Sequence, residues 1–235
     1  DSRVARDVVF LAPELDLRIT HLAVEIVATV ALVDHDAVVG VYGDRGLVVP
    51  AVERSADHPL DRRDVQPGVR LRPKIPEQFR SAPYVFLANI DPRLQLEVLR
   101  QVERPKLVAC DTMNFWIESR RPDLMELLKH VDAILLNDGE ARQLTEHAKL
   151  VKAARWILNR CPKIVIIKKG EHGAFMFTEH SVFFAPAYPL EDVFDPTGAG
   201  DSFAGGFTGY LARTGKLDEE HMRRAVASGS AMGWF

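Results

Sequence analysis

The chain has 235 residues, of which 47% are hydrophobic, so it is long enough to bury the core of one large domain. Its formal net charge is −3 at pH 7, with basic and acidic residues intermixed, which argues against nucleic acid or an anionic membrane as a partner. The longest apolar stretch, residues 22–33, is too short to span a bilayer and contains Glu25. Cys110 and Cys161 form no zinc-binding pattern, and two lone thiols without a signal-peptide pattern favour a reducing, cytoplasmic location.

The first third of the chain gives the weakest structural signal. Residues 8–12 and 37–43 are apolar runs that could form strands. Residues 52–78 are charged and rich in proline with weak periodicity, which is typical either of a poorly ordered loop or of an incomplete lid. This part of the sequence therefore predicts little about function.

From residue 84 onward, short apolar runs alternate with helical patterns. The predicted strands are residues 84–90, 106–112, 132–137 and 163–170, and the predicted helices are residues 92–102 and 123–131 and two segments within 139–160. Strands that read as continuous apolar runs are buried on both faces, and helices between them indicate βαβ crossovers. The sequence therefore predicts an α/β fold with a central, mostly parallel sheet.

The last part of the chain predicts a β-hairpin over residues 174–188, a long helix after a glycine-rich loop, and a final helix over residues 219–235. Parallel sheets bind their ligands at the carboxyl ends of the strands. The residues at these ends are therefore candidates for one shared site: Asn89, Asp91, Asp111, Asn114, Asn137, Glu140, Lys168 and Gly170.

The glycine-rich loop FDPTGAGDSFAGGF predicts a binding site for an oxyanion. Asp195 and Pro196 open a turn, and Gly198, Ala199 and Gly200 carry little or no side chain. Their backbone N–H groups can point at one centre, and the helix that follows adds its free N–H groups and its positive N-terminal dipole.

Asp201 follows in the first turn of that helix. A carboxylate there could simply complement the helix dipole, but beside an anion site it repels the anion unless it has another task. Accepting the proton of a hydroxyl that attacks phosphorus is such a task. The loop is not a Walker A motif, since no G-K-[ST] follows the glycines, and Phe203 replaces the third glycine of a Rossmann fingerprint.

The run DPTGAGDSFAGGFTGYL, residues 195–211, strongly resembles the C-terminal signature of the ribokinase family, the PfkB-type carbohydrate kinases. The resemblance implies a ribokinase-like, three-layer α/β/α fold, with a lid that is incomplete or divergent here. It implies transfer of the γ-phosphoryl group of ATP to a hydroxyl of a sugar. Asp201 would be the general base, and Gly198, Ala199 and Gly200 would form the anion hole.

Two further segments resemble the family's nucleotide site. LLNDGEA resembles its N-x-x-E motif, in which Asn137 and Glu140 would organise Mg²⁺ and the phosphates; in the alternative, Asn137 ends a strand and Glu140 lies in a first helical turn. IVIIKKGEHGAF resembles the segment that lines the nucleotide, so Lys168, Gly170 and Gly173 would approach ATP.

The resemblance assigns other residues to ATP and to the acceptor. Thr197 belongs with the nucleotide-binding residues. Strand alternation places Lys169 on the face opposite Lys168, where we expect it to be a solvated charge. VACDTMNFWI resembles a segment of uncharacterised bacterial sugar kinases, in which Asp111 and Asn114 would lie near the substrate and the transferred phosphate.

The N-terminal third departs from the family pattern. Asp16 is the candidate for the aspartate that holds substrate hydroxyls, but the Gly-Gly-Asn signature is missing, and only VVGVYGD partly resembles a family strand end. The expected organisation is a single kinase domain over residues 1–235, with a divergent segment 1–71 and a C terminus that stops early. The chain is then either a working kinase with a divergent N terminus or a degraded, nucleotide-binding relative.

Three expectations about ligands and partners stay open. The acceptor is a small molecule, either a sugar or, as an alternative, a nucleoside. ATP and Mg²⁺ are the implied cofactors, with K⁺ as a candidate activator from the family. A homodimer is a candidate assembly, and neither nucleic acid nor a membrane is an expected partner.

Overall fold

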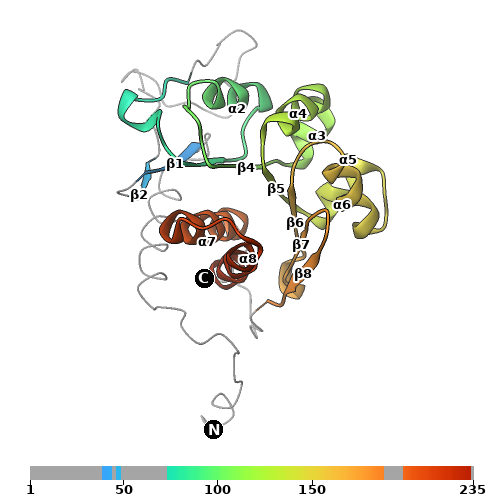
Figure 1. The fold of residues 1–235 in the computed structure, drawn as a ribbon. Coiled ribbons are helices and arrows are strands. Elements are labelled where there is room, and N and C mark those ends of the chain that lie inside the picture. Colours follow the sequence, from blue (N-terminus) through green and yellow to red (C-terminus); the bar gives the residue numbers. More distant parts are fainter. Residues whose placement is uncertain (1–38, 44–45, 49–72, 188–197, 234–235) are drawn as a thin grey trace, which may run out of the picture.

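One sheet organises the structure (Figure 1). The computed structural model describes residues 39–43, 46–48, 73–187 and 198–233. Within these residues, eight strands lie in the order β2-β1-β3-β4-β5-β6-β7-β8. The strands are β1 (Val39–Gly43), β2 (Gly46–Val48), β3 (Tyr84–Leu87), β4 (Leu107–Asp111), β5 (Ala133–Asn137), β6 (Ile164–Lys168), β7 (Ala174–Phe177) and β8 (Val182–Ala185).

Seven α-helices accompany the sheet in the described part of the chain. They are α2 (Pro92–Leu99), α3 (Asn114–Ser119), α4 (Arg121–Leu127), α5 (Asp138–Thr145), α6 (Leu150–Leu158), α7 (Ala199–Thr214) and α8 (Glu219–Met232). Short 3₁₀ turns cover Glu77–Phe79, Leu128–His130 and Gly170–His172.

The centre of the sheet is parallel, as the alternation of strands and helices predicts. Strands β3, β4, β5 and β6 pair in parallel, each with its neighbour. Antiparallel strands complete both edges, with β1 and β2 beside β3, and β7 and β8 beside β6. All four parallel strands therefore end at the same edge, where a parallel sheet binds its ligands.

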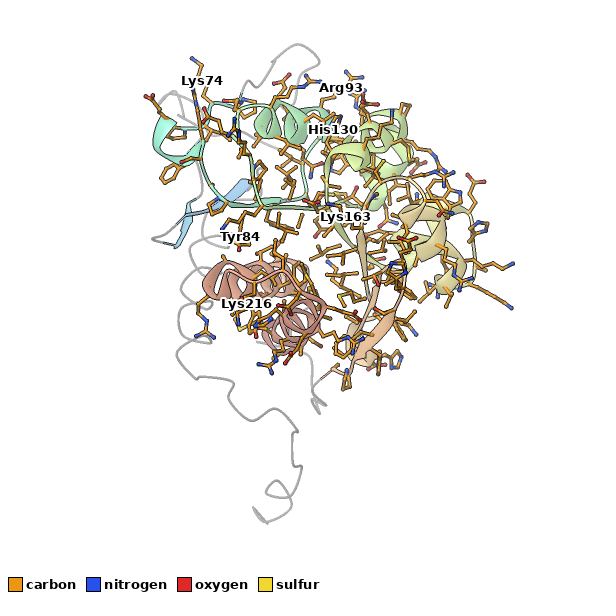
Figure 2. The ribbon with its side chains drawn as sticks, viewed as in Figure 1. Lys74, Tyr84, Arg93, His130, Lys163 and Lys216 are labelled. Atoms are coloured by element: carbon orange, nitrogen blue, oxygen red, sulfur yellow. The ribbon has the colours of Figure 1, made fainter. Side chains whose placement is uncertain are left out.

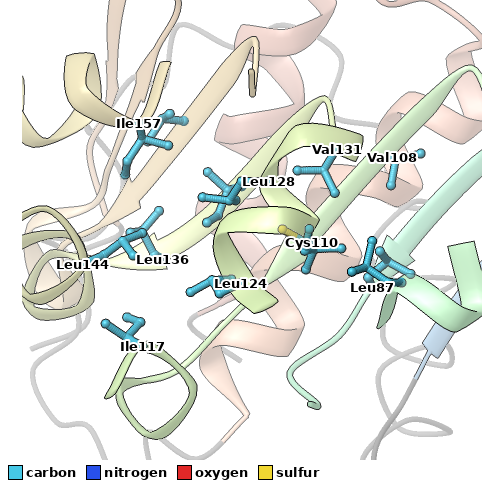
Figure 3. Packing of buried hydrophobic residues seen from close by; sticks show 14 of the residues in the cluster. Leu87, Val108, Cys110, Ile117, Leu124, Leu128, Val131, Leu136, Leu144 and Ile157 are labelled. Carbon is cyan, nitrogen blue, oxygen red and sulfur yellow. The ribbon is translucent and has the colours of Figure 1, made fainter. Parts of the chain in front are cut away.

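Two apolar layers sandwich the sheet, because alternate residues of each strand face opposite sides. One layer packs α2 to α6 against residues such as Leu87, Cys110 and Leu136 (Figure 3). The other packs α7 and α8 against residues such as Tyr84 and Leu135. Figure 2 shows Tyr84 between β3 and α7. The arrangement is the three-layer α/β/α fold that the resemblance implied.

Helices α7 and α8 pack unusually closely. An added Cβ at Gly206 would lie 2.8 Å from Met232 Cγ and 2.9 Å from Gly229 Cα, and one at Gly229 would lie 2.7 Å from the carbonyl oxygen of Phe203. Overpacking by one methyl group at such a site typically costs about 1–3 kcal/mol. Gly206 and Gly229 thus allow the close approach of α7 and α8, which anchors the long helix that begins at Ala199.

The structure bears out most of the elements predicted after residue 84, with boundaries shifted by a few residues. It adds α3, which the sequence pattern did not predict, because its apolar residues Phe115 and Trp116 precede Ile117 without a clear period. The predicted strand at residues 8–12, most of the 52–78 segment, Asp16 and Thr197 lie outside the described residues. No helix in the described part of the chain combines the length and the apolarity that a membrane span requires.

Candidate active site

Three polar side chains end neighbouring strands on the face that α7 covers. Asp111 is the last residue of β4, Asn137 of β5 and Lys168 of β6. On each strand, the residue two positions earlier packs in the same layer as α7 and α8; these residues are Ala109, Leu135 and Ile166. Residues two apart on a strand share a face, so all three polar side chains lie on the α7 side of the sheet. Asn137 and Lys168 are direct partners in the parallel register. The strand register alone therefore places these three residues at one edge of the sheet, independently of the loops.

An ion pair joins two of these strand ends. Lys168 Nζ lies 3.5 Å from Asp111 Oδ2, and the two side chains are 18% and 8% exposed. Asp111 Oδ1 also accepts the backbone N–H of Thr112 at 2.7 Å. Burial raises the pKa of Asp111, while the Lys168 charge and the Thr112 N–H pull this pKa back down. The lysine is thus held over the strand ends by a carboxylate that burial makes costly to ionise.

The N terminus of α7 lies directly against this lysine. An added Cβ at Gly200 would lie 3.0 Å from Lys168 Nζ, so any larger residue would push against the ammonium group. Gly198 caps the helix in the left-handed conformation, with φ at +82°, which glycine adopts without steric cost. Its carbonyl accepts the N–H of Ser202 at 2.8 Å. The N–H groups that precede Ser202 are in the first turn, where a helix offers no partner of its own.

Asp201 occupies the first turn of α7 beside the ion pair. The residue is exposed, yet enough protein surrounds its carboxyl group for burial to raise the pKa of Asp201. The Asp111 charge raises this pKa further, and Lys168 lowers it. A higher pKa makes the carboxylate a stronger base, which is what proton transfer from a hydroxyl requires.

Asn137 and Glu140 form a reciprocal capping box at the start of α5. Asn137 Oδ1 accepts the N–H of Glu140 at 2.8 Å, and Glu140 Oε2 accepts the N–H of Asn137 at 2.7 Å. This is the arrangement that the structural alternative anticipated. Glu140 is 7% exposed, and burial raises its pKa, with Asp111 adding to the rise and Lys168 opposing it. The charges of Asp111 and Lys168 therefore act on the Glu140 carboxyl from the neighbouring strand ends.

Other predicted site residues have different surroundings. Asn114 is exposed, and its amide donates to Gln143 Oε1 at 2.6 Å. Gly173 has a φ of +95°, and an added Cβ would lie 2.1 Å from the carbonyl oxygen of Ala185, so this glycine is required by the approach of β8. Gly170 has a φ of +52° and open space beside it. Of these three, only Gly170 leaves a backbone surface open to a ligand.

Two residues near the predicted site have clear local roles. Asp91 caps α2 by accepting the N–H of Arg93 at 2.9 Å. Gln95 is 1% exposed and donates to three main-chain carbonyls at the ends of β3 and β4, including that of Asp111. Gln95 was not predicted from the sequence; a polar residue inside the buried stripe of α2, between Pro92 and Val98, was the signal that could have found it.

The fold agrees with what is found when the chain is compared with known proteins. The model of the pfkB family carbohydrate kinases matches residues 77–232. The chain belongs to this family. A cytidine kinase of Thermococcus kodakarensis is 33% identical over 150 residues, which cover 62% of this chain and 53% of that protein. A nucleoside kinase of Methanocaldococcus jannaschii is 24% identical over 131 residues, covering 52% of this chain and 40% of that protein.

Solved structures show the same fold. The aminoimidazole riboside kinase of Salmonella enterica, crystallised with aminoimidazole riboside and an ATP analogue, aligns with a TM-score of 0.57 and 24% identity, covering 64% of this chain and 55% of that one. The adenosine kinase of Trypanosoma brucei brucei aligns with a TM-score of 0.58 and 21% identity, covering 66% and 51%. The chain spans about half the length of such relatives.

The raised pKa of Asp201 predicts that Asp201→Asn stabilises the protein at neutral pH. Folding disfavours the charged form, so the penalty is complete above the native pKa and fades as the pH falls toward the ordinary value of 3.8. We expect the Tm of the variant to exceed that of wild type by roughly 1–3 °C at pH 7, a small rise because the residue is exposed. The difference should shrink toward pH 4 in thermal unfolding.

Asp218→Asn is a control of opposite sign. Hydrogen bonds from His221 lower the pKa of Asp218 at the cap of α8, so its charged form is favoured by folding. This variant should lose stability at pH 7. An Asp201→Asn variant that also loses stability at pH 7 would contradict the electrostatic account of the site.

Proposed function

We propose that this chain carries out ATP-dependent phosphotransfer, moving the γ-phosphoryl group of ATP to a hydroxyl group of a sugar. The proposal is supported chiefly by one observation: the first turn of α7, with Asp201 in it, abuts a lysine that is ion-paired at the strand ends. This arrangement sets a base, a cation and N–H groups that have no partner within their own helix beside one another. Phosphoryl transfer depends on positioning and on charge stabilisation of this kind.

Asp201 acts as the general base. The acceptor oxygen forms a bond to the γ-phosphorus, its proton passes to the Asp201 carboxylate, and the bond from phosphorus to the bridging oxygen of ADP breaks. Burial and the Asp111 charge both raise the pKa of Asp201. These surroundings increase the basicity of the carboxylate, which favours this role over that of a helix-start residue.

The opening of α7 supplies the anion hole. The N–H groups of Gly198, Ala199 and Gly200 precede the first residue whose N–H is bonded within the helix, namely Ser202. The helix dipole adds positive potential at the same point. Lys168 Nζ stands against Gly200 and can share the charge of the transferring group. Gly170 follows the same strand with open space beside it, and with Thr197 it completes the proposed nucleotide site. Gly173, which β8 approaches closely, stays a prediction for that site.

Glu140 and Asn137 are the residues that would hold Mg²⁺. Glu140 Oε2 is used by the capping box, while Oε1 makes no hydrogen bond to a described residue. A single carboxylate oxygen suits this ion, which keeps several waters and binds mainly through phosphates. When bound, the ion neutralises charge on the phosphates. No group of three His, Cys, Asp or Glu side chains in the described residues forms a separate metal cluster.

A nucleoside is the second candidate acceptor. The cytidine kinase of Thermococcus kodakarensis is 33% identical over 150 residues, which supports a ribose hydroxyl on a nucleoside as much as a free sugar. Asp111 and Asn114 remain the proposed acceptor-binding residues in the described part of the chain, together with Asp201, and Asp16 lies outside that part. K⁺ activation, a homodimer, a cytoplasmic location and a single domain over residues 1–235 also remain predictions.

ADP release with ATP, Mg²⁺ and a panel of acceptors tests the reaction. The panel contains ribose, fructose, cytidine and adenosine. Asp201→Asn should lose nearly all turnover, a loss of about 10³-fold or more for removal of a general base that acts with the anion hole, while ATP binding by calorimetry is retained. Near wild-type turnover in Asp201→Asn would refute the role of Asp201. Binding of ATP without transfer to any acceptor would favour a non-catalytic nucleotide-binding protein.

Adjacent lysines provide a matched test of the phosphate site. Lys168→Met should weaken ATP binding and slow transfer, each by about tenfold, because a charge beside the γ-phosphate is lost. Lys169→Met should change neither, because Lys169 lies beyond the end of β6 and its charge acts on Asp138 instead of on Asp201. Equal effects of the two substitutions would show that the position of Lys168 does not matter.

A further inference from the structure

Gln95 joins the two strands that lead into the site. It projects from α2 and is 1% exposed. Its side-chain Nε2 donates to the carbonyl oxygens of Leu87 at 3.0 Å, Ala88 at 2.8 Å and Asp111 at 3.1 Å. The first two carbonyls end β3, and the third ends β4.

This contact begins where the sheet pairing stops. The register between β3 and β4 has Leu87 opposite Cys110 as its last pair. Ala88 and Asp111 are the next residue on each strand, so the Gln95 amide bridges the first position at which the two strands lack ladder bonds to each other. Parallel strands separate at this edge of the sheet, where ligands bind. The amide therefore replaces the missing pair.

The hydrogen bonding of Gln95 is not optimised for stability. An amide nitrogen has two hydrogens, so three carbonyls share two donors. Its Oε1 is buried and makes no hydrogen bond to a described residue, and the same holds for the buried Thr112 hydroxyl beside Asp111. Burying an unpaired acceptor is costly. Stabilisation of the core therefore does not account for a buried glutamine at this position. The hydrogen bonds that Gln95 donates to the strand ends account for it better.

We propose that Gln95 is a positioning residue for Asp111. By fixing the Asp111 carbonyl, it sets the backbone from which the Asp111 carboxylate reaches Lys168 Nζ at 3.5 Å, and this ammonium group lies against Gly200 in the first turn of α7, beside Asp201. The Asp111 charge also raises the pKa of Asp201. The inference rests on the proposed function, because it assigns Gln95 a part in tuning the proposed base. Gln95 itself touches neither the nucleotide site nor the reacting atoms.

The test compares Gln95→Met with Gln101→Met in the full chain. Both changes keep the size of the side chain and remove its donors. Gln101 also holds the main chain, since its Nε2 donates to Pro73 and Glu97 and its Oε1 accepts the N–H of Ile75. Gln101 lies beyond the C-terminal end of α2, and none of these three hydrogen-bond partners belongs to β4 or to its Asp111. The control therefore matches the loss of backbone bonds without touching the site.

The expected result separates positioning from stability. Both variants should lower Tm by similar amounts. Only Gln95→Met should lower kcat, by about tenfold, as is usual when a supporting residue behind a site is removed. The KM for ATP should change less than twofold. In Gln95→Met, the acid limb of the pH–rate profile should also move to lower pH, because a displaced Asp111 no longer raises the pKa of Asp201.

A second readout does not depend on activity. In the protein without ligands, ¹³C-labelled aspartate carboxyls are titrated by NMR and assigned with Asp111→Asn and Asp201→Asn. The pKa of Asp201 should be lower in Gln95→Met than in wild type. In Gln101→Met it should equal that of wild type. If no acceptor is phosphorylated but this shift occurs, the proposed function fails while the positioning role stands.

Two outcomes would overturn the inference. One is an unchanged titration and pH profile in Gln95→Met; the other is an equal loss of kcat in both variants. Should Gln95→Met fail to fold, Gln95→Glu repeats the comparison, because it keeps the shape and, when protonated, one donor. Its activity should then rise as the pH falls relative to wild type, and a fixed ratio across pH would contradict the proposal.

Discussion

The contact between Lys168 and the start of α7 is the interaction on which the site depends. Asp111 fixes Lys168 at the sheet by an ion pair. Gly200 lets the helix lie so close to the ammonium group that an added Cβ would be 3.0 Å from Lys168 Nζ. Without that approach, the free N–H groups of α7 and the Asp201 carboxylate would not share a space with the strand ends. The contact between the sheet and the start of α7 thus contains an ion pair whose charges are costly to bury.

Close packing elsewhere holds α7 in that place. Gly206 and Gly229 let α7 and α8 meet without side chains between them, and the apolar face of the pair covers the sheet. The two buried carboxyls, Asp111 and Glu140, and the more exposed Asp201 all have raised pKa values, mainly because the surrounding protein desolvates them. Such a cluster lowers stability at neutral pH. Its presence at the strand ends is the pattern expected where function is kept at the expense of stability.

The sequence predicted the layers better than the site contacts. Apolar runs such as 133–136 and helical spacing on α7 are local patterns, so strands, helices and the shared strand edge followed from them. That Lys168 and Lys169 face opposite ways, as strand alternation indicates, stays a prediction. The partner of Asn114, the reason for Gly173 and the bridge made by Gln95 depend on neighbours distant in the chain, which no local pattern specifies. The predictions for Asp16 and Thr197 fall outside the described residues.

The most direct test of the account is a crystal structure of this chain with Mg²⁺ and a non-hydrolysable ATP analogue. We expect the γ-phosphate within hydrogen-bond distance of the N–H groups of Ala199 and Gly200 and of Lys168 Nζ, with the Asp201 carboxylate facing the acceptor side of the phosphorus. A triphosphate bound away from the first turn of α7, with Lys168 making no contact to it, would contradict the account.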